Sequence, residues 1–173
     1  IVDAAKDGHI QPLYFVMGES ELNETTAAHL PGYRGMGPVR VGNAAAGQLQ
    51  LDIYGELADA MTQAIKGGLP RNSRGAAIAR AILPYLEGIW REPDEGLWEV
   101  RGGRQHFVHS KVMAWVAFDR AAGLADTTEE GRERSRHYRQ VADEICDAVC
   151  RRGLDAGGRH FVPAYGSTEL DAS

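Results

Sequence analysis

Residues 92–103 hold the densest group of side chains that could do acid–base chemistry. The segment reads EPDEGLWEVRGG and places four carboxylates beside the indole of Trp98 in a glycine-flanked loop. Cleavage of a glycosidic bond needs one protonated carboxylic acid beside the leaving oxygen. An apolar wall keeps an acid protonated because desolvation raises the pKa of a carboxyl group. Trp98 next to Glu99 would supply that wall; the alternative is a solvated acidic turn whose tryptophan is buried for packing.

A second glycine-rich stretch, residues 32–40 (GYRGMGPVR), offers backbone N–H groups and arginine side chains that could hold a ligand. Tyr33 could also present an apolar face to a sugar ring. The stretch matches neither the GxGxxG dinucleotide fingerprint after a strand nor a P-loop, because GK[ST] is absent. The alternative is a structural loop that packs against helix ends.

Two other sets of side chains suggest metal binding but lack a third ligand. His106 and His109 stand beside Lys111 at the start of an apolar segment, where capping or a hydrogen-bonded core role is the expectation. Cys146 and Cys150 stand one helical turn apart, and we expect them to be buried as small hydrophobic residues. We therefore expect no metal and no other cofactor.

Composition narrows the class of protein. The 173 residues hold 19 Lys and Arg against 24 Asp and Glu, a formal net charge of −5, which argues against a nucleic-acid partner. The hydrophobic share of 43% suits a globular protein with a packed core. No apolar run approaches the roughly 18 residues of a membrane span, and no secretion signal is visible. We expect a cytoplasmic protein with no membrane partner.

The loops that carry these residues alternate with helical patterns. Apolar residues recur at helical spacing from Asn43, a plausible N-cap, to a stop at Gly67-Gly68. The other expected helices span residues 74–91, 106–125 and 131–152. Pro84 should kink or shorten the helix that contains it. The helix over 106–125 is apolar on nearly all sides, which is typical of a buried helix.

No alternation of strands and helices accompanies this pattern, so it predicts an all-α array of antiparallel helical hairpins. The long loops at 19–42 and 92–105 fall at one end of the array, while the connections near 67–73 and 123–131 fall at the other. Functional residues gather on long loops that a rigid scaffold positions. Any active site is therefore expected at the long-loop end.

Two long strings carry a resemblance to a known family. GYRGMGPVRVGNAAAGQLQLDIYGE (residues 32–56) and PDEGLWEVRGGRQHFVHSKVMAWVAFDRA (residues 93–121) resemble the bacterial branch of glycoside hydrolase family 15, which contains glucoamylases, related α-glucosidases and trehalases. The final GRHFVPAYGSTELDAS is similar to the segment that follows in that family. The resemblance implies an (α/α)6 toroid, in which two rings of helices surround a central pocket. Residues 1–173 would form one segment from the middle of that catalytic domain.

The resemblance also implies an inverting mechanism with one general acid and one general base. The general acid of the family sits in a Leu-Trp-Glu motif, which here is Leu97-Trp98-Glu99, so the resemblance assigns the acid to Glu99. Leu97 and Trp98 match residues that help to form the pocket for the non-reducing glucose. The fungal branch has a second Glu after the acid, whereas this chain has Val100 followed by Arg101. The contacts to the leaving group therefore differ from those of the fungal branch.

The general base of the family has no match in this chain. It lies well downstream in the family, and nothing in residues 100–173 resembles it. Asp94 and Glu95 are not expected to replace it. The chain begins at Ile1 rather than Met, and we expect an internal segment of a longer protein that is inactive alone. The apolar helix over 106–125 would then expose a patch through which copies form a homo-oligomer.

From the sequence we predict a fragment of an inverting α-glucoside hydrolase. Glu99 would protonate the glycosidic oxygen while water attacks from the opposite face. The substrate would be trehalose or a short α-glucan. The predicted substrate-binding residues are Leu97, Trp98, Arg101, Tyr33 and Arg40. The alternative is a non-catalytic carbohydrate-binding or regulatory module built on the same helical toroid.

Overall fold

Four α-helices form most of the structure. The computed structural model describes residues 7–98, 103–124 and 128–170. The helices are α1 (Asp52–Lys66), α2 (Ser73–Ile89), α3 (Val108–Leu124) and α4 (Glu129–Arg152). The predicted all-α class is confirmed, and the fold agrees with a segment of the toroid that the resemblance implies. Within these described residues, no helix combines the length and the apolar character needed to cross a membrane.

The start of α1 differs from the prediction. Asn43 is an N-cap, but it caps the short 3-10 helix η2 (Ala44–Gly47), where its side chain accepts a hydrogen bond from the Ala45 amide at 2.9 Å. The chain is extended again at Gln48, and α1 begins only at Asp52. The reason is tertiary, because residues 49 and 51 give their backbone N–H groups to a distant loop rather than to a helix.

The other helices lie close to where the pattern predicts them. The side chain of Asn72 caps α2 by accepting from the Gly75 amide at 2.8 Å, and Thr128 caps α4 by accepting from the Gly131 amide at 3.0 Å. α2 continues through Pro84 to Ile89, so the expected shortening does not occur. Pro84 lies on the exposed side of α2, where its ring meets solvent rather than a packed neighbour.

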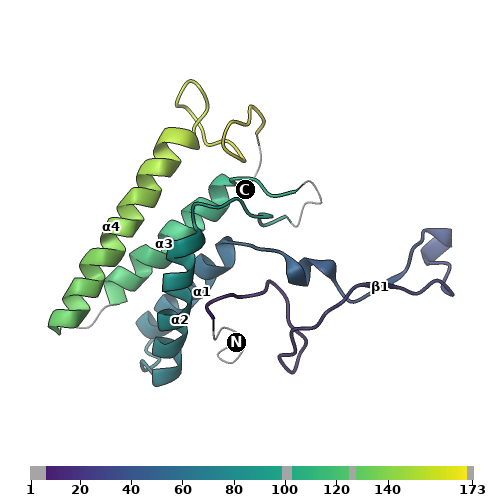
Figure 1. Cartoon of the computed structure of the whole chain (residues 1–173), viewed down its shortest axis with the longest axis horizontal. Coiled ribbons are helices and arrows are strands. Elements are labelled where there is room, and N and C mark those ends of the chain that lie inside the picture. The colour runs from purple at the N-terminus through teal and green to yellow at the C-terminus, as the bar shows by residue number, and fades with distance from the viewer. Residues whose placement is uncertain (1–6, 99–102, 125–127, 171–173) are drawn as a thin grey trace.

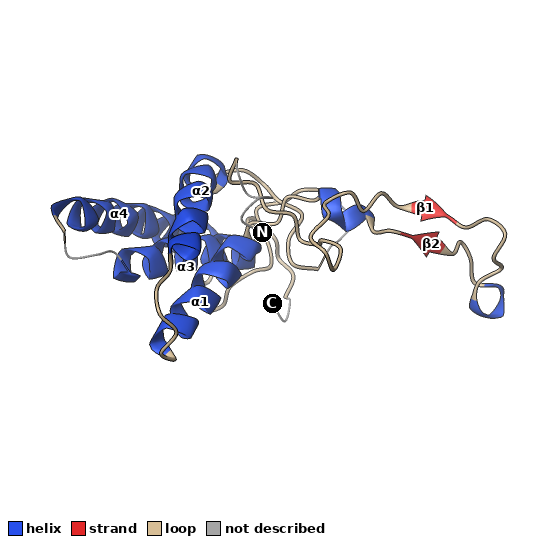
Figure 2. Ribbon diagram, turned by 90° about the horizontal axis from the view of Figure 1, so that it is seen from below, coloured by secondary structure: helices blue, strands red, loops and turns tan. Residues whose placement is uncertain are grey.

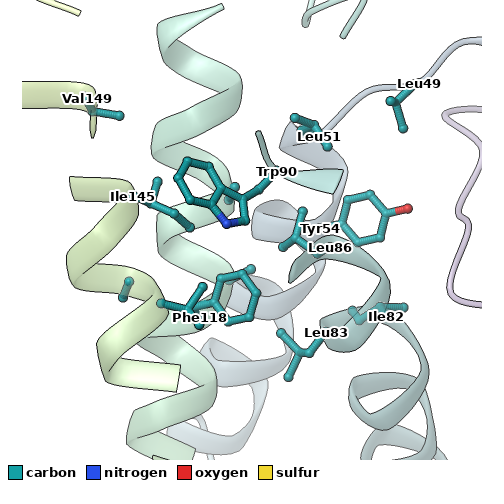
Figure 3. Close-up of a cluster of buried hydrophobic side chains, with 14 of the residues drawn as sticks. Leu49, Leu51, Tyr54, Ile82, Leu83, Leu86, Trp90, Phe118, Ile145 and Val149 are labelled. Atoms are coloured by element: carbon teal, nitrogen blue, oxygen red, sulfur yellow. The ribbon is translucent and has the colours of Figure 1, made fainter. Parts of the chain in front are cut away.

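The core forms where the four helices meet. Figure 3 shows its side chains gathered into one group around the indole of Trp90. Tyr54 of α1, Leu86 of α2, Phe118 of α3 and Ile145 of α4 are all fully buried. α3 packs against both α1 and α4, and α3 and α4 run side by side in Figure 1.

The contact between α1 and α3 depends on a glycine. A Cβ atom at Gly55 would lie only 2.2 Å from the carbonyl oxygen of Met113. This distance is far shorter than a van der Waals contact, so no side chain fits at position 55. The backbones of α1 and α3 can approach this closely only because the residue there is a glycine.

One burial prediction holds only in part, and a second is wrong. α1 and α4 cover part of α3, and none of the large, exposed apolar side chains among the described residues lies on this helix. Val112, Met113, Trp115 and Val116 are half-buried, so the described part of α3 offers partly exposed apolar side chains rather than the expected open patch. Cys146 and Cys150 are exposed rather than buried, since α4 turns Val149 and Ile145 toward the core and the two thiols away from it.

A projecting segment, which we call the arm, comprises residues 22–43. It holds β1 (Thr25–Thr26) and β2 (Arg40–Val41), an antiparallel pair with Thr25 opposite Val41, and the 3-10 turn η1 (Tyr33–Gly35). The Asn43 amide donates to the Leu22 carbonyl at 3.0 Å and closes the base of the arm. Figures 1 and 2 both show the arm extending away from the helices.

Candidate active site

The long loops share one end of the helical array, as predicted. α1 and α3 begin at this end, and α2 and α4 finish there, since α1 is followed by α2, and α3 by α4, at the other end. The C-terminal segment also returns to this end. The Val108 amide donates to the Pro163 carbonyl, and the Tyr165 amide donates to the His106 carbonyl, both at 3.0 Å. The segment after α4 is thus paired with the entry to α3 through the bridge between Phe107 and Ala164.

The loop that follows α2 is closed at its base. The backbone N–H groups of Asp94 and Gln105 each donate to the carbonyl of the other residue at 2.9 Å. Beside this bridge, the Arg104 guanidinium donates to Glu95 Oε1 at 2.9 Å. The two ends of the segment between residues 94 and 105 are therefore pinned together at its base. We call this segment the acid loop because it contains the predicted general acid.

Of the predicted site residues in the acid loop, two are described. Leu97 is 41% exposed and Trp98 is 61% exposed, so both apolar side chains face outward in this chain. Glu99 and Arg101 lie outside the described residues.

Two carboxylates fasten the acid loop to the segment before α1. Glu95 Oε2 accepts from the Leu49 amide at 2.7 Å, and the Glu95 amide donates back to the Leu49 carbonyl at 2.9 Å. Asp94 Oδ2 accepts from the Leu51 amide at 3.1 Å. These contacts satisfy backbone groups that would otherwise be buried without partners. Asp94 and Glu95 therefore act as structural clamps.

Gly96 makes the turn that leads into Leu97 and Trp98. Its φ of +73° lies in the left-handed region, where other residues are strained. A Cβ atom here would also lie 2.6 Å from the ring of Phe107. Its amide donates to Asp94 Oδ2 at 3.3 Å, which links the turn to the clamp. The glycine in the GLW string is thus required by the local geometry.

Buried polar side chains concentrate beneath the acid loop. Of the six polar residues that are buried within the described parts of the chain, five lie at the starts of α1 and α3 or in the acid loop: Gln50, Asp52, Asp94, Ser110 and Lys111. Such a concentration of buried ionisable groups marks a candidate functional site.

Burial shifts the pKa of each ionisable group in this cluster. It raises the pKa of Asp52. It also raises the pKa of Asp94, although the Ser110 hydroxyl, the Leu51 amide and the charge of Lys111 oppose the shift. Burial lowers the pKa of Lys111 to about 8, against the attraction of Asp94. In each case desolvation of the charged form outweighs the favourable partners.

Lys111 spans from α3 to the end of α2. Its ammonium donates to the carbonyl oxygens of Trp90 at 2.8 Å and of Glu92 at 2.5 Å. The ring of His106 stacks on Tyr165, with 5.7 Å between centroids, so this half-buried histidine has a packing role rather than the expected capping or hydrogen-bonded one. No three His, Cys, Asp or Glu side chains in the described ranges lie where they could share a metal ion.

The structure does not bring Tyr33 and Arg40 next to Leu97 and Trp98. Both belong to the arm, which Figures 1 and 2 show reaching away from the helix ends. Tyr33 is 72% exposed, and Arg40 forms an ion pair with Glu24 at 2.6 Å. The predicted site residues that are described therefore fall into two separate groups.

A hollow of about 410 Å³ opens on another side of the same helix ends. It lies between α4, the turn after α2 and the C-terminal segment, and its lining includes Arg91, Arg152, Tyr165 and Lys111. None of the predicted site residues that the structure describes lines this hollow. A sugar site next to Leu97 and Trp98 therefore needs walls other than those of this hollow.

Comparison with known proteins settles the family. The family model described as "Glycosyl hydrolases family 15" matches residues 2–173. The chain belongs to glycosyl hydrolase family 15. Its pinned acid loop and its buried polar cluster are therefore features of a family 15 segment.

The relatives of this family 15 chain include several proteins named trehalase. One from Mycobacterium tuberculosis is 42% identical over 95% of this chain and 24% of its own length. One from Mycolicibacterium smegmatis is 41% identical over 99% of this chain and 26% of its own length, and one from Thermoplasma volcanium is 34% identical over 97% and 27%. The chain thus spans about a quarter of the length of these curated relatives. No solved structure matched it.

Sequence reasoning missed two features of this family 15 site. It treated Lys111 as part of a histidine-rich helix start, although a charged residue directly before the apolar run of a buried helix signals a specific buried partner. It counted Asp94 and Glu95 as loop acids without seeing their clamp role. Nothing in the local sequence points to residues 49–51 as their partners, since that contact joins segments more than forty positions apart.

Proposed function

We propose that the protein to which this chain belongs hydrolyses trehalose and that it does so as an inverting glycosidase. The observation that carries the proposal is the similarity to proteins named trehalase along nearly the whole chain. The sequence by itself left trehalose and short α-glucans open. The names of the relatives favour trehalose.

In this proposal Glu99 is the general acid, and Leu97 and Trp98 supply the apolar surface beside the glucose. Their outward-facing side chains support this role, because an apolar surface is what a sugar ring packs against. Arg101 is proposed as a polar contact to the leaving sugar. Tyr33 and Arg40 remain proposed substrate contacts, which the arm would have to bring to the sugar in the whole protein.

The described residues support the proposal because they hold the two ends of the acid loop at the helix ends. Effective acid catalysis needs the proton held at the glycosidic oxygen within a fraction of an ångström, and pinned loops provide such precision. Both carboxylates nearest the loop base already bind backbone or arginine groups. We therefore propose that the general base comes from a part of the protein outside this chain.

The proposed reaction proceeds by protonation and single displacement. Glu99 gives its proton to the oxygen between the two glucose units, and a water molecule attacks the anomeric carbon from the opposite face while a base takes its proton. Because attack inverts one centre and leaves the other untouched, α,α-trehalose would yield one β-glucose and one α-glucose. A retaining enzyme would release two α-glucose molecules instead.

The test uses the full-length protein. Proton NMR in the first minutes after mixing would record whether trehalose gives equal amounts of α- and β-glucose. Glu99→Gln should lower turnover by about 10²–10⁴-fold, whereas Glu133→Gln, on the exposed surface of α4, should leave it unchanged. Full activity of Glu99→Gln would refute the assigned acid. Binding of trehalose without hydrolysis by the wild type would support the binding-module alternative.

A further inference from the structure

Lys111 is the buried cation of the candidate site. Only 1% of the residue is exposed, and its ammonium donates to the carbonyls of Trp90 and Glu92, at and just after the C-terminal cap of α2. Trp90 is the C-terminal cap of α2, where helix carbonyls lack donors from the helix itself. A cation there also meets the negative end of the helix dipole. Lys111 therefore fixes the chain as it leaves α2 toward Leu97 and Trp98.

Packing alone does not account for a lysine at this position. Taking an ammonium group out of water is costly, whereas an unbranched apolar side chain would fill much of the same space without that cost. The buried positions farther along α3 are apolar, for example Ala114, Ala117 and Phe118. What the lysine adds is a pair of directed donors that hold residues 90–92.

Charged groups from several elements face the Lys111 ammonium. The carboxylates of Asp94 and Glu92 in the segment after α2 favour its charged form, and Arg152 at the end of α4 disfavours it. His106, just before α3, also interacts with this ammonium: burial lowers the pKa of the His106 imidazole, and the positive charge of Lys111 lowers it further. At neutral pH the amine remains mostly protonated, as donation to two carbonyls requires.

We propose that Lys111 is a positioning residue for the hydrolysis, holding residues 90–92 and hence Leu97 and Trp98 in the arrangement that the reaction needs. This inference rests on the function proposed above. The base of the acid loop is held separately, by the bridge between Asp94 and Gln105. Loss of Lys111 therefore leaves the loop closed and changes only its approach from α2.

The experiment compares two substrates that differ in their need for an acid. Trehalose has a poor leaving group that must be protonated, whereas the fluoride of α-D-glucosyl fluoride departs without a general acid. A misplaced acid loop therefore slows trehalose selectively, while partial unfolding slows both substrates alike. The full-length protein would carry Lys111→Met, with Lys66→Met on the exposed end of α1 as the matched control.

We expect Lys111→Met to lower kcat for trehalose by about 10–100-fold, with KM within about threefold and the fluoride rate within about threefold. Lys66→Met should behave like the wild type on both substrates. Thermal unfolding of each variant, measured in the same buffer, ensures that rates are compared below the transition. If Lys111→Met does not fold, Lys111→Gln, whose neutral amide can still donate a hydrogen bond, takes its place. The ratio of its trehalose rate to its glucosyl fluoride rate is then compared with that of the wild type.

The outcomes separate the two proposals. An active wild type whose Lys111 variant loses both substrates equally, or loses neither, would overturn the positioning role and leave the proposed function intact. A wild type inactive on both trehalose and the fluoride would instead overturn the proposed function, and this inference with it.

Discussion

Replacing Gly55 by alanine should destabilise the protein even though alanine is the better helix former. The added Cβ would lie 2.2 Å from the Met113 carbonyl oxygen and 2.7 Å from its carbonyl carbon. Both atoms belong to the backbone of α3 and cannot rotate away, so α1 and α3 would have to separate by about 1 Å. Overpacking of this kind costs about 1–3 kcal/mol, and the gain in helix propensity returns about 1 kcal/mol at most. Because backbone must move, we expect a net loss of about 1–2 kcal/mol.

A second helical glycine provides the matched control. A Cβ at Gly88 in α2 meets nothing within 4 Å, so Gly88→Ala should stabilise the protein by about 0.5–1 kcal/mol. Urea unfolding of the full-length protein, followed by helical circular dichroism, should move the midpoint in opposite directions for the two variants. A midpoint that rises for Gly55→Ala as it does for Gly88→Ala would refute the close-packing argument.

Three further predictions concern the loop end. Gly96→Ala forces a side chain into a left-handed turn and within 2.6 Å of the Phe107 ring, so stability should fall by about 1–3 kcal/mol together with trehalose turnover; an unchanged urea midpoint would contradict this. Burial lowers the pKa of Lys111 to about 8 from the 10.5 of an exposed lysine, so unfolding takes up a proton and stability should rise with pH between these values. Urea midpoints at pH 8 and 10 should show a smaller rise in Lys111→Met, and an identical slope would count against the burial argument. Tyr54→Phe removes the hydroxyl that accepts from the Ile10 amide at 3.3 Å, which should cost about 1–2 kcal/mol and speed exchange of that amide; unchanged exchange would show that the bond is unimportant.

Helical periodicity was sufficient for the part of the fold that local interactions determine. It located α2 and α4, each of which has an apolar face and a capped start, and α3, which is apolar on most sides; the order of these helices then placed the long loops at one end. It failed at the start of α1. There the residues around Leu49 bind Glu95, and no local pattern reports a contact between segments so far apart in the chain.

The place of the acid loop at the helix ends was predictable from the sequence, but the roles of Asp94 and Glu95 were not. A carboxylate-rich loop with a tryptophan is visible in the sequence, and the structure pins that loop at the helix ends. The sequence did not show which of its acids are structural, because Asp94 and Glu95 become clamps only by accepting hydrogen bonds from backbone N–H groups of the distant segment before α1. Tyr33 and Arg40 were grouped with Leu97 and Trp98 because both pairs lie in strings that resemble the family, yet the arm that carries Tyr33 and Arg40 extends away from the helices.

The short connection between α1 and α2 lies at the end of the helices remote from the acid loop, and its Leu69 side chain is 63% exposed. Exposed turns of this kind tolerate inserted peptides better than helices or buried loops do. An affinity tag or an attachment point for a solid support could therefore be introduced between residues 67 and 72. The protein would then be immobilised through the end remote from the acid loop, and the face proposed to bind the sugar would stay accessible to substrate in solution.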